Sequence, residues 1–374
     1  MMNTPNMELK KINRNRVFRF ILQQEATSKS EISYQLKISL PTVTQNITAL
    51  KEQNLIVESG EYESTGGRRA KMLSCNAMSR VALGIDITRN HISAVVVNLL
   101  GNTVDSIREN FNCRDIPNTL PKIQQLIERL LKANRIKDST VLGVGVSLPA
   151  IIAGDYQSIE TALVLPFPLD YYQQMQPYMR FPYLFYNDAN CGGFAELWSR
   201  KPTKHDMFYF SLSATVGGAA MINDQIYTGC NFSGGEIGHI TLVPNGKPCY
   251  CGQTGCMDCY CNSNCLAELT DGNLPDFFTL LQQGDPAARA RMDVYLEYLA
   301  ISIHNVRMLF DCDIILGGYV GSYSDLFLED LCKRLQAKDT FNRKPDYVMG
   351  CHHHTEAAAV GAALMYISRF IDQV

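Results

Sequence analysis

The hydrophobic pattern of the chain changes at Val81, and this change limits the folds that the sequence can adopt. Before it, apolar residues recur every three to four positions in short segments bounded by helix caps. After it, nearly continuous apolar runs such as Val81–Ile87 alternate with amphipathic segments. Such runs are typical of strands that are buried on both faces of a sheet. The sequence therefore predicts a small helical head followed by a larger α/β body.

Strands and helices are expected to alternate along the body. We expect strands at residues 81–87, 91–99, 103–108, 141–148, 207–213, 219–222 and 313–318, and helices near 120–132 and 293–310. A length of 374 residues allows two or three domains, and a hydrophobic content of 46% excludes wholesale disorder. The one obvious hinge is the stretch 76–80. The predicted domains are therefore residues 1–78 and 79–374.

The net charge of −3 is the sum of two parts of opposite sign. Residues 1–80 hold 12 Lys and Arg against 7 Asp and Glu, a balance of +5, and the remainder carries −8. A basic head on an acidic body suggests a nucleic-acid-binding module joined to a domain with another task. The sequence shows neither a signal-peptide core nor a run long enough to span a membrane, so we expect a cytoplasmic protein with no membrane partner.

The head contains three predicted helices. Ser28–Glu31 forms a capping box before the second helix, and Ser39 caps the third, whose first turn contains Pro41. The buried stripe of the third helix is Val43, Ile47 and Leu50. Its other face carries short hydrogen-bonding side chains suited to base edges and phosphates, and we predict DNA contacts from Thr42, Thr44, Gln45 and Thr48.

Residues 55–73 are predicted to form two strands around a glycine-containing loop. Arg68, Arg69 and Lys71 follow the glycine pair of this loop and are expected to contact the DNA backbone. Three helices followed by a basic hairpin indicate a winged helix-turn-helix. A generic three-helix packing module is the alternative interpretation.

Two segments of the body resemble a known family. One runs Gly234-Gly235-Glu236-Ile237-Gly238-His239, then nine residues, then Cys249-Tyr250-Cys251-Gly252-Gln253-Thr254-Gly255-Cys256-Met257-Asp258. The other is Asn187-Asp188-Ala189-Asn190, and Gly143–Val146 and Leu316–Gly318 add glycine-rich turns. Together they resemble the ROK family (repressors, open reading frames and sugar kinases) from about Val81 onward. The added winged helix resembles the regulator branch, with sugar-responsive repressors of the xylose, N-acetylglucosamine and glucose type.

This resemblance implies a two-lobed, actin/hexokinase-like body of ribonuclease H-like topology. It also implies that Asn187, Asp188, Glu236 and His239 bind the hydroxyls of an effector sugar. The family motif ends in Glu where this chain has Asp258, which we include among the expected sugar contacts.

One His and three Cys in the segment 239–256 can close a tetrahedral site around Zn²⁺. The expected ligands are His239, Cys249, Cys251 and Cys256. Four protein ligands leave no open position, so the metal would be structural. The alternative is a set of buried free thiols, and this is the interpretation we adopt for the neighbouring Cys259, Cys261 and Cys265.

A ROK-type ATP-dependent sugar kinase is the alternative function. The resemblance places Asp188 where the enzymes have their general base. However, Thr88 and Arg89 stand where family kinases have the glycine pair that lets backbone amides approach phosphates. The second phosphate turn, Ser213–Gly218, also lacks glycines where the enzymes usually have them. We therefore expect no enzymatic activity and a vestigial role for Asp188.

The sequence thus predicts a DNA-binding transcriptional regulator, by default a repressor, of sugar-utilisation genes. The expected partners are operator DNA and a sugar or sugar phosphate bound in the body. Because palindromic operators require a two-fold protein, we expect at least a homodimer.

Overall fold

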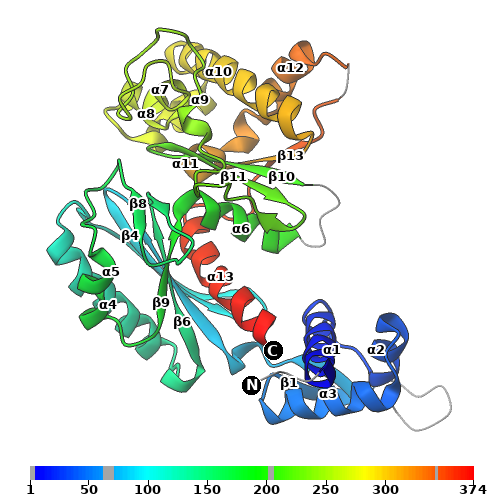
Figure 1. Cartoon of the computed structure of the whole chain (residues 1–374). Coiled ribbons are helices and arrows are strands. Elements are labelled where there is room, and N and C mark those ends of the chain that lie inside the picture. Colours follow the sequence, from blue (N-terminus) through cyan, green and yellow to red (C-terminus); the bar gives the residue numbers. More distant parts are fainter. Residues whose placement is uncertain (1–4, 62–70, 201–205, 342–343) are drawn as a thin grey trace.

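Three helices and a two-stranded sheet form the head in the computed structural model, which describes residues 5–61, 71–200, 206–341 and 344–374 (Figure 1). The helices are α1 (Pro5–Leu22), α2 (Lys29–Leu36) and α3 (Leu40–Glu52), and the antiparallel strands are β1 (Ile56–Glu61) and β2 (Lys71–Cys75). Ser28 and Ser39 accept the backbone N–H groups of Glu31 and Thr42, at 3.2 and 3.4 Å, so both predicted caps are present. The arrangement is that of a winged helix-turn-helix.

The first lobe of the body is a five-stranded sheet with the order β5-β4-β3-β6-β9. Its strands are β3 (Val81–Ile87), β4 (His91–Asn98), β5 (Thr103–Asn110), β6 (Val141–Leu148) and β9 (Tyr183–Asn187), with α4 (Ile116–Ala133) packed on one face. The first three strands are antiparallel, whereas β3, β6 and β9 are parallel. A small hairpin of β7 (Ile151–Ile152) and β8 (Ile159–Thr161) and the short helix α5 (Tyr171–Met175) lie beside the sheet.

The second lobe repeats this topology with the order β12-β11-β10-β13-β14. Its strands are β10 (Met207–Leu212), β11 (Val216–Ile222), β12 (Gln225–Ile226), β13 (Asp313–Gly317) and β14 (Val348–Gly350). Its helices are α7 (Asp258–Cys261), α8 (Asn264–Ala267), α9 (Leu274–Gln283), α10 (Pro286–Phe310), α11 (Gly318–Gly321) and α12 (Leu328–Lys338). Two lobes with the same strand order confirm the actin/hexokinase-like fold expected from the sequence.

Two helices, α6 (Asp188–Arg200) and α13 (Ala357–Gln373), pack against each other between the two sheets (Figure 1). Glycines make the close packing possible. A Cβ atom at Gly145 of β6 would lie 2.1 Å from the carbonyl oxygen of Ala362, and one at Gly361 would lie 1.8 Å from that of Cys191. The backbone of α13 therefore rests directly on β6 and on α6.

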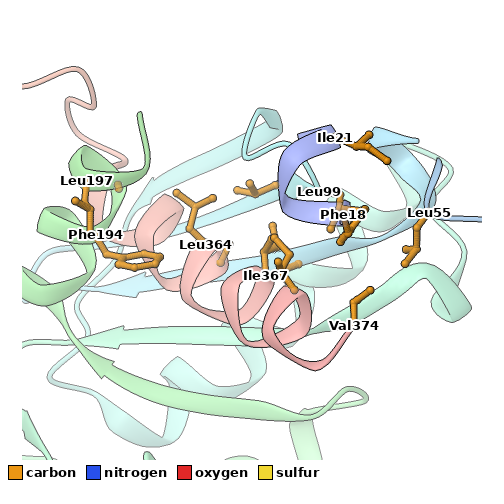
Figure 2. Close-up of a cluster of buried hydrophobic side chains, with 14 of the residues drawn as sticks. Phe18, Ile21, Leu55, Leu99, Phe194, Leu197, Leu364, Ile367 and Val374 are labelled. Atoms are coloured by element: carbon orange, nitrogen blue, oxygen red, sulfur yellow. The ribbon is translucent and has the colours of Figure 1, made fainter. Parts of the chain in front are cut away.

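The head is docked on the end of α13. Figure 2 shows Phe18 and Ile21 of α1 beside Leu99, Ile367 and Val374, and these residues belong to one continuous buried cluster. Polar contacts fix the same joint: Arg14 Nε donates to the carbonyl of Val374 at 2.5 Å, Asn15 donates to that of Ile371, and Arg19 pairs with Asp372. The head and the body thus share a core.

Two helices begin earlier than the sequence pattern predicted. Helix α4 begins at Ile116, where Asp115 caps it, and α10 begins at Pro286, where the Asp285 carboxylate accepts the N–H of Ala288 at 2.9 Å. In both cases a proline occupies the first turn, where its missing N–H costs nothing. Within the described residues, no helix combines the length and apolar character needed to cross a membrane.

Candidate functional site

The segment that links β9 to α6 carries two of the predicted sugar contacts. Asn187 is the last residue of β9, and its amide donates to the Ala150 carbonyl at 3.2 Å and accepts the N–H of Asn190 at 2.9 Å. Asp188 is the first residue of α6, and one carboxylate oxygen accepts the N–H of Ala189 at 2.8 Å. These contacts hold both side chains at the edge of a cavity.

Asn187, Asp188, Glu236 and His239 all line this cavity, which has a volume of about 130 Å³ and is called the acid cavity below. Glu236 and His239 reach it from a short 3-10 turn (Ile237–His239) that follows Gly235, whose φ of +89° turns the chain into the site. The structure therefore brings four of the five predicted sugar contacts together.

Both carboxyl groups of the acid cavity hold their protons more strongly than usual. Burial, together with the nearby carboxylates of Asp86 and Glu236, raises the pKa of Asp188 to about 7. Burial also raises the pKa of Glu236. With a pKa of about 7, Asp188 can both donate and accept hydrogen bonds near neutral pH, as recognition of sugar hydroxyls requires.

Asp258 is the exception among the predicted sugar contacts. It is 3% exposed, does not line the acid cavity, and accepts the backbone N–H of Val216 at 2.6 Å. The carboxylate thus ties the start of β11 to α7. The structure therefore does not place Asp258 with the other four predicted sugar contacts, since its short side chain ends at the backbone and not in the cavity.

Tyr250 lines the acid cavity, although the sequence analysis did not select it. Its hydroxyl lies 3.5 Å from Nε2 of His239, and the two rings meet edge to face at 5.4 Å. Its position between Cys249 and Cys251 was the available signal, because a residue between two ligands of one site must lie close to that site.

The four predicted metal ligands form one cluster, in which the ligand atoms of His239, Cys249, Cys251 and Cys256 all lie within 4.8 Å of one another. The sulfurs of Cys251 and Cys256 are 3.7 Å apart, and Nδ1 of His239 lies 3.9 Å from the Cys249 sulfur. A tetrahedral site with Zn–S bonds of about 2.3 Å has ligand separations of about 3.8 Å. None of the thirteen cysteines forms a disulfide. The residues therefore fit a zinc ion.

The neighbouring cysteines lie outside this cluster. Cys259 faces the Pro248 carbonyl at 3.5 Å, Cys265 faces the Cys259 carbonyl at 3.5 Å, and Cys261 is fully buried in the core of the second lobe. Their positions agree with the expectation of free thiols.

The imidazole of His239 connects the metal cluster to the acid cavity. Nδ1 faces the sulfur of Cys249, whereas Nε2 faces the hydroxyl of Tyr250 on the cavity side. A metal on Nδ1 would leave Nε2 as an N–H donor, which fixes both the tautomer and the orientation of the ring.

A second cavity of about 200 Å³ lies at the first phosphate turn predicted from the sequence, and Thr88, Arg89 and Asp86 line it. The hydroxyl of Thr88 accepts the N–H of His91 at 3.1 Å and donates to the His91 carbonyl at 3.0 Å. The amide of this turn is therefore already hydrogen-bonded. The Asp86 carboxyl is engaged as well, because it is 5% exposed and accepts a hydrogen bond from the Ser147 hydroxyl at 2.8 Å.

Arg108 contacts two residues that line this cavity, Tyr319 and Thr355. From β5 of the first lobe it donates to the Tyr319 hydroxyl at 3.0 Å and to the Thr355 carbonyl at 3.1 Å. Its guanidinium also lies over the Tyr319 ring, 5.3 Å from the centroid. This contact was not anticipated, because nothing in the sequence pairs β5 with α11.

The predicted DNA contacts lie on α3 and the wing. Gln45 and Thr48 are exposed, whereas Thr42 and Thr44 are half-buried, and Thr48 donates to the Thr44 carbonyl at 3.0 Å. In the wing, Lys71 pairs with Glu58, as does Lys51, and these hydrogen bonds lower the pKa of Glu58 to about 2. Arg68 and Arg69 lie outside the described residues.

Residues 82–369 of the chain match the sequence pattern of the ROK family. The chain belongs to the ROK family. The match covers both lobes and ends within α13, and so includes the acid cavity and the Cys–His cluster.

Proteins similar to this chain include both repressors and sugar kinases. A xylose repressor of Bacillus subtilis (strain 168) is 23% identical over 98% of this chain and 97% of its own length. A glucokinase of Halalkalibacterium halodurans is 26% identical, but the match covers 68% of this chain and 85% of the enzyme. The crystal structure of a ROK family transcriptional regulator, described as a homolog of the E. coli MLC protein, superimposes with a TM-score of 0.77 at 19% identity, over 98% of this chain and 97% of the regulator.

Proposed function

We propose that this ROK protein is a sugar-responsive transcriptional repressor, with a DNA-binding head at residues 1–78 and a sensing body at residues 79–374. The observation that carries the proposal is the extent of the matches. The xylose repressor and the regulator structure match the head as well as the body, at 98% of the chain, whereas the glucokinase match covers 68%.

In the head, α3 is the element proposed to enter the major groove of operator DNA. Gln45 and Thr48 are exposed on it and present an amide and a hydroxyl to base edges. Thr42 and Thr44 lie near its N-terminal end, where backbone phosphates are favoured. The wing cations Arg68, Arg69 and Lys71 are proposed to contact phosphates.

In the body, a sugar or sugar phosphate is proposed to bind in the acid cavity. Asp188 and Glu236 offer carboxyl groups with raised pKa values, and Asn187 and His239 offer an amide and an imidazole. Each can hydrogen-bond a different hydroxyl of the ring. A structural Zn²⁺ bound by His239, Cys249, Cys251 and Cys256 would hold the imidazole in place.

The route from ligand to DNA is proposed to run through α6 and α13. Helix α6 begins at the ligand contact Asp188 and packs along α13, whose last turn holds the head. A sugar that binds one lobe arrangement more tightly would shift the position of α13 and hence of the two recognition helices of a homodimer. Release of DNA by sugar is the proposed sign of the response.

A sugar kinase is the second candidate, and the observation that favours it is Asp188 in a cavity with a pKa of about 7, suited to a general base. The Thr88–His91 hydrogen bonds disfavour it, because they occupy the backbone N–H groups of both residues in the turn where the kinases bring amides to phosphates. A coupled assay for ATP consumption, run with a panel of hexoses and pentoses, separates the two functions.

The experiment that tests the proposal is recovery and sequencing of the genomic fragments that the purified chain binds. A repressor should retain a small set of fragments with two-fold symmetric sequences and release them when a particular sugar is added. Binding without sequence preference, or binding that no sugar changes, would contradict the proposal.

A further inference from the structure

A third cavity, larger than the other two, lies where the head meets the body. It has a volume of about 580 Å³ and is called the head-side cavity below. Arg19 of the head, Ser368 and Asp372 of α13, Tyr186 of β9, and residues 223–226 and Thr228 of the second lobe all line it. Asn187 lines both this cavity and the acid cavity, so the two are neighbours.

Two buried polar atoms on the wall of the head-side cavity have no hydrogen-bond partner within the part of the chain that the structure describes. They are the hydroxyl of Tyr186, a residue that is 2% exposed, and Oδ1 of Asn190. The Arg369 guanidinium acts on this hydroxyl as a charge and lies close to hydrogen-bonding reach of it, but the contact lacks the geometry of a hydrogen bond, and the guanidinium lies over the Tyr156 ring, 5.1 Å from the centroid. Since buried polar groups without partners are costly, their presence beside a cavity points to a ligand or water that satisfies them.

The lining of the cavity favours a neutral ligand that is rich in hydroxyls. Hydroxyl and amide side chains dominate its polar part, namely Tyr156, Tyr186, Asn187, Asn190, Asn223, Gln225, Thr228 and Ser368. The charges of Arg19 and Asp372 are paired with each other, and Asp224 has an interaction partner of its own. Phe232 adds an apolar ring. Amides and hydroxyls that both donate and accept are suited to sugar hydroxyls.

Size gives the same indication. Ligand sites in proteins usually have volumes of about 300–1,000 Å³. The head-side cavity, at about 580 Å³, lies within this range, whereas the acid cavity, at about 130 Å³, is well below it.

We propose that the head-side cavity is a second binding site for a neutral sugar. The hydroxyls of this sugar form hydrogen bonds with Tyr186 and Asn190, and its binding affects the Arg19–Asp372 ion pair. The DNA response, but not the binding itself, rests on the proposed function. The head-side cavity differs from the acid cavity because the side chains proposed to contact the sugar there include no unpaired carboxylate.

Binding to the full chain can be measured by calorimetry with a panel of probes: D-xylose, D-glucose, N-acetyl-D-glucosamine and their β-1,4-linked disaccharides. Tyr186→Phe removes the unpartnered hydroxyl and keeps the ring. Tyr171→Phe is the matched control, because its hydroxyl is also buried and unpartnered within the described residues but does not line this cavity. Glu236→Ala reports on the acid cavity separately.

We expect Tyr186→Phe to weaken binding of at least one probe about tenfold, without lowering the melting temperature of the free protein, and Tyr171→Phe to leave that binding unchanged. A monosaccharide that still binds Glu236→Ala indicates an independent second site. A disaccharide that Tyr186→Phe and Glu236→Ala both weaken indicates one ligand spanning the two cavities, and this also supports the site.

Two results would overturn the inference. If probe binding depends on Glu236 while both tyrosine variants behave like the wild type, the head-side cavity is not a sugar site, although the proposed function stands. If no probe binds, the cavity is not a site for neutral sugars, and the recovery of bound genomic fragments then decides the DNA-binding function independently.

Discussion

Replacing Asp188 by Asn provides a quantitative test of the electrostatics of the acid cavity. The side chain is half-buried, lies at the junction of β9 and α6, and has its pKa raised by burial from 3.8 to about 7. Between these two values the folded protein retains a proton that the unfolded chain releases. Rising pH therefore favours unfolding, and the stability present below pH 4 is lost as the pH rises through 7.

The size of the effect follows from the shift. At about 1.36 kcal/mol per pKa unit, an ionised Asp188 costs at most about 4 kcal/mol of folding free energy above pH 7. Because the side chain borders two cavities, solvent screens part of this, and we expect about 2 kcal/mol. Asn keeps the shape and carries no charge, so Asp188→Asn should be more stable than the wild type at pH 8, with an advantage that grows by about 1–3 kcal/mol between pH 5 and pH 8.

Urea unfolding at pH 5, 6, 7 and 8 measures this directly, with the fluorescence of Trp198 as the probe. Trp198 is the single tryptophan of the chain, and it lies on α6, where it packs against Phe194 and its indole N–H donates to the Leu100 carbonyl at 3.3 Å. Asp170→Asn, at an exposed position, is the control for loss of one negative charge.

The pH dependence that the two chains share, including that of any bound metal, cancels in the difference between variant and wild type. A difference that stays flat from pH 5 to pH 8 would show that Asp188 is ionised normally, and the assignment of a buried protonated carboxyl to the acid cavity would be wrong. The variant should also bind the effector sugar less tightly, because it has lost one acceptor oxygen.

Three further predictions concern the Cys–His cluster, the wing of the head, and the contact between the head and α13. Cys256→Ser should remove about one equivalent of zinc and lower the melting temperature, whereas Cys259→Ser should retain the metal; metal analysis of both proteins shows whether the cluster is the site. Replacing Arg68 and Arg69 with Ala should weaken binding to all DNA sequences and flatten the dependence on salt, and an unchanged salt slope would contradict phosphate contacts. Ile371→Ala opens a void at a position only 1% exposed, so it should weaken the packing of the head on α13 by about 2–4 kcal/mol. It should also reduce the effect of sugar on the affinity for DNA fragments, which a binding titration with and without sugar would reveal.

The elements that periodicity determines were predictable. The strand Val81–Ile87 and the caps at Ser28 and Ser39 are local patterns, and the structure contains each of them. The Cys–His cluster was predictable as well, because three of its ligands lie within a segment of eight residues, Cys249–Cys256, and the spacing itself limits where they can point.

Features that depend on contacts distant in sequence were not predictable. Asp258 has a favourable position in the motif, but its carboxylate binds the N–H of Val216, 42 residues away. Arg108 meets Tyr319 across 211 residues. The contact between Arg14 and Val374 joins opposite ends of the chain, 360 positions apart. No local sequence pattern in the head predicts the surface of the body against which it packs.

The joint between the head and α13 also limits how such a protein can diversify. Regulators that recognise different DNA sequences can arise by exchange of the whole head, but here the first helix of the head is fastened to Ile371, Asp372 and Val374. A transplanted head would therefore bind its DNA and ignore the ligand unless it carried matching residues at positions 14, 15 and 19. Compatibility between heads and bodies thus depends on the last two turns of α13, and designed sensors that combine a new head with this body should exchange residues 367–374 together with it.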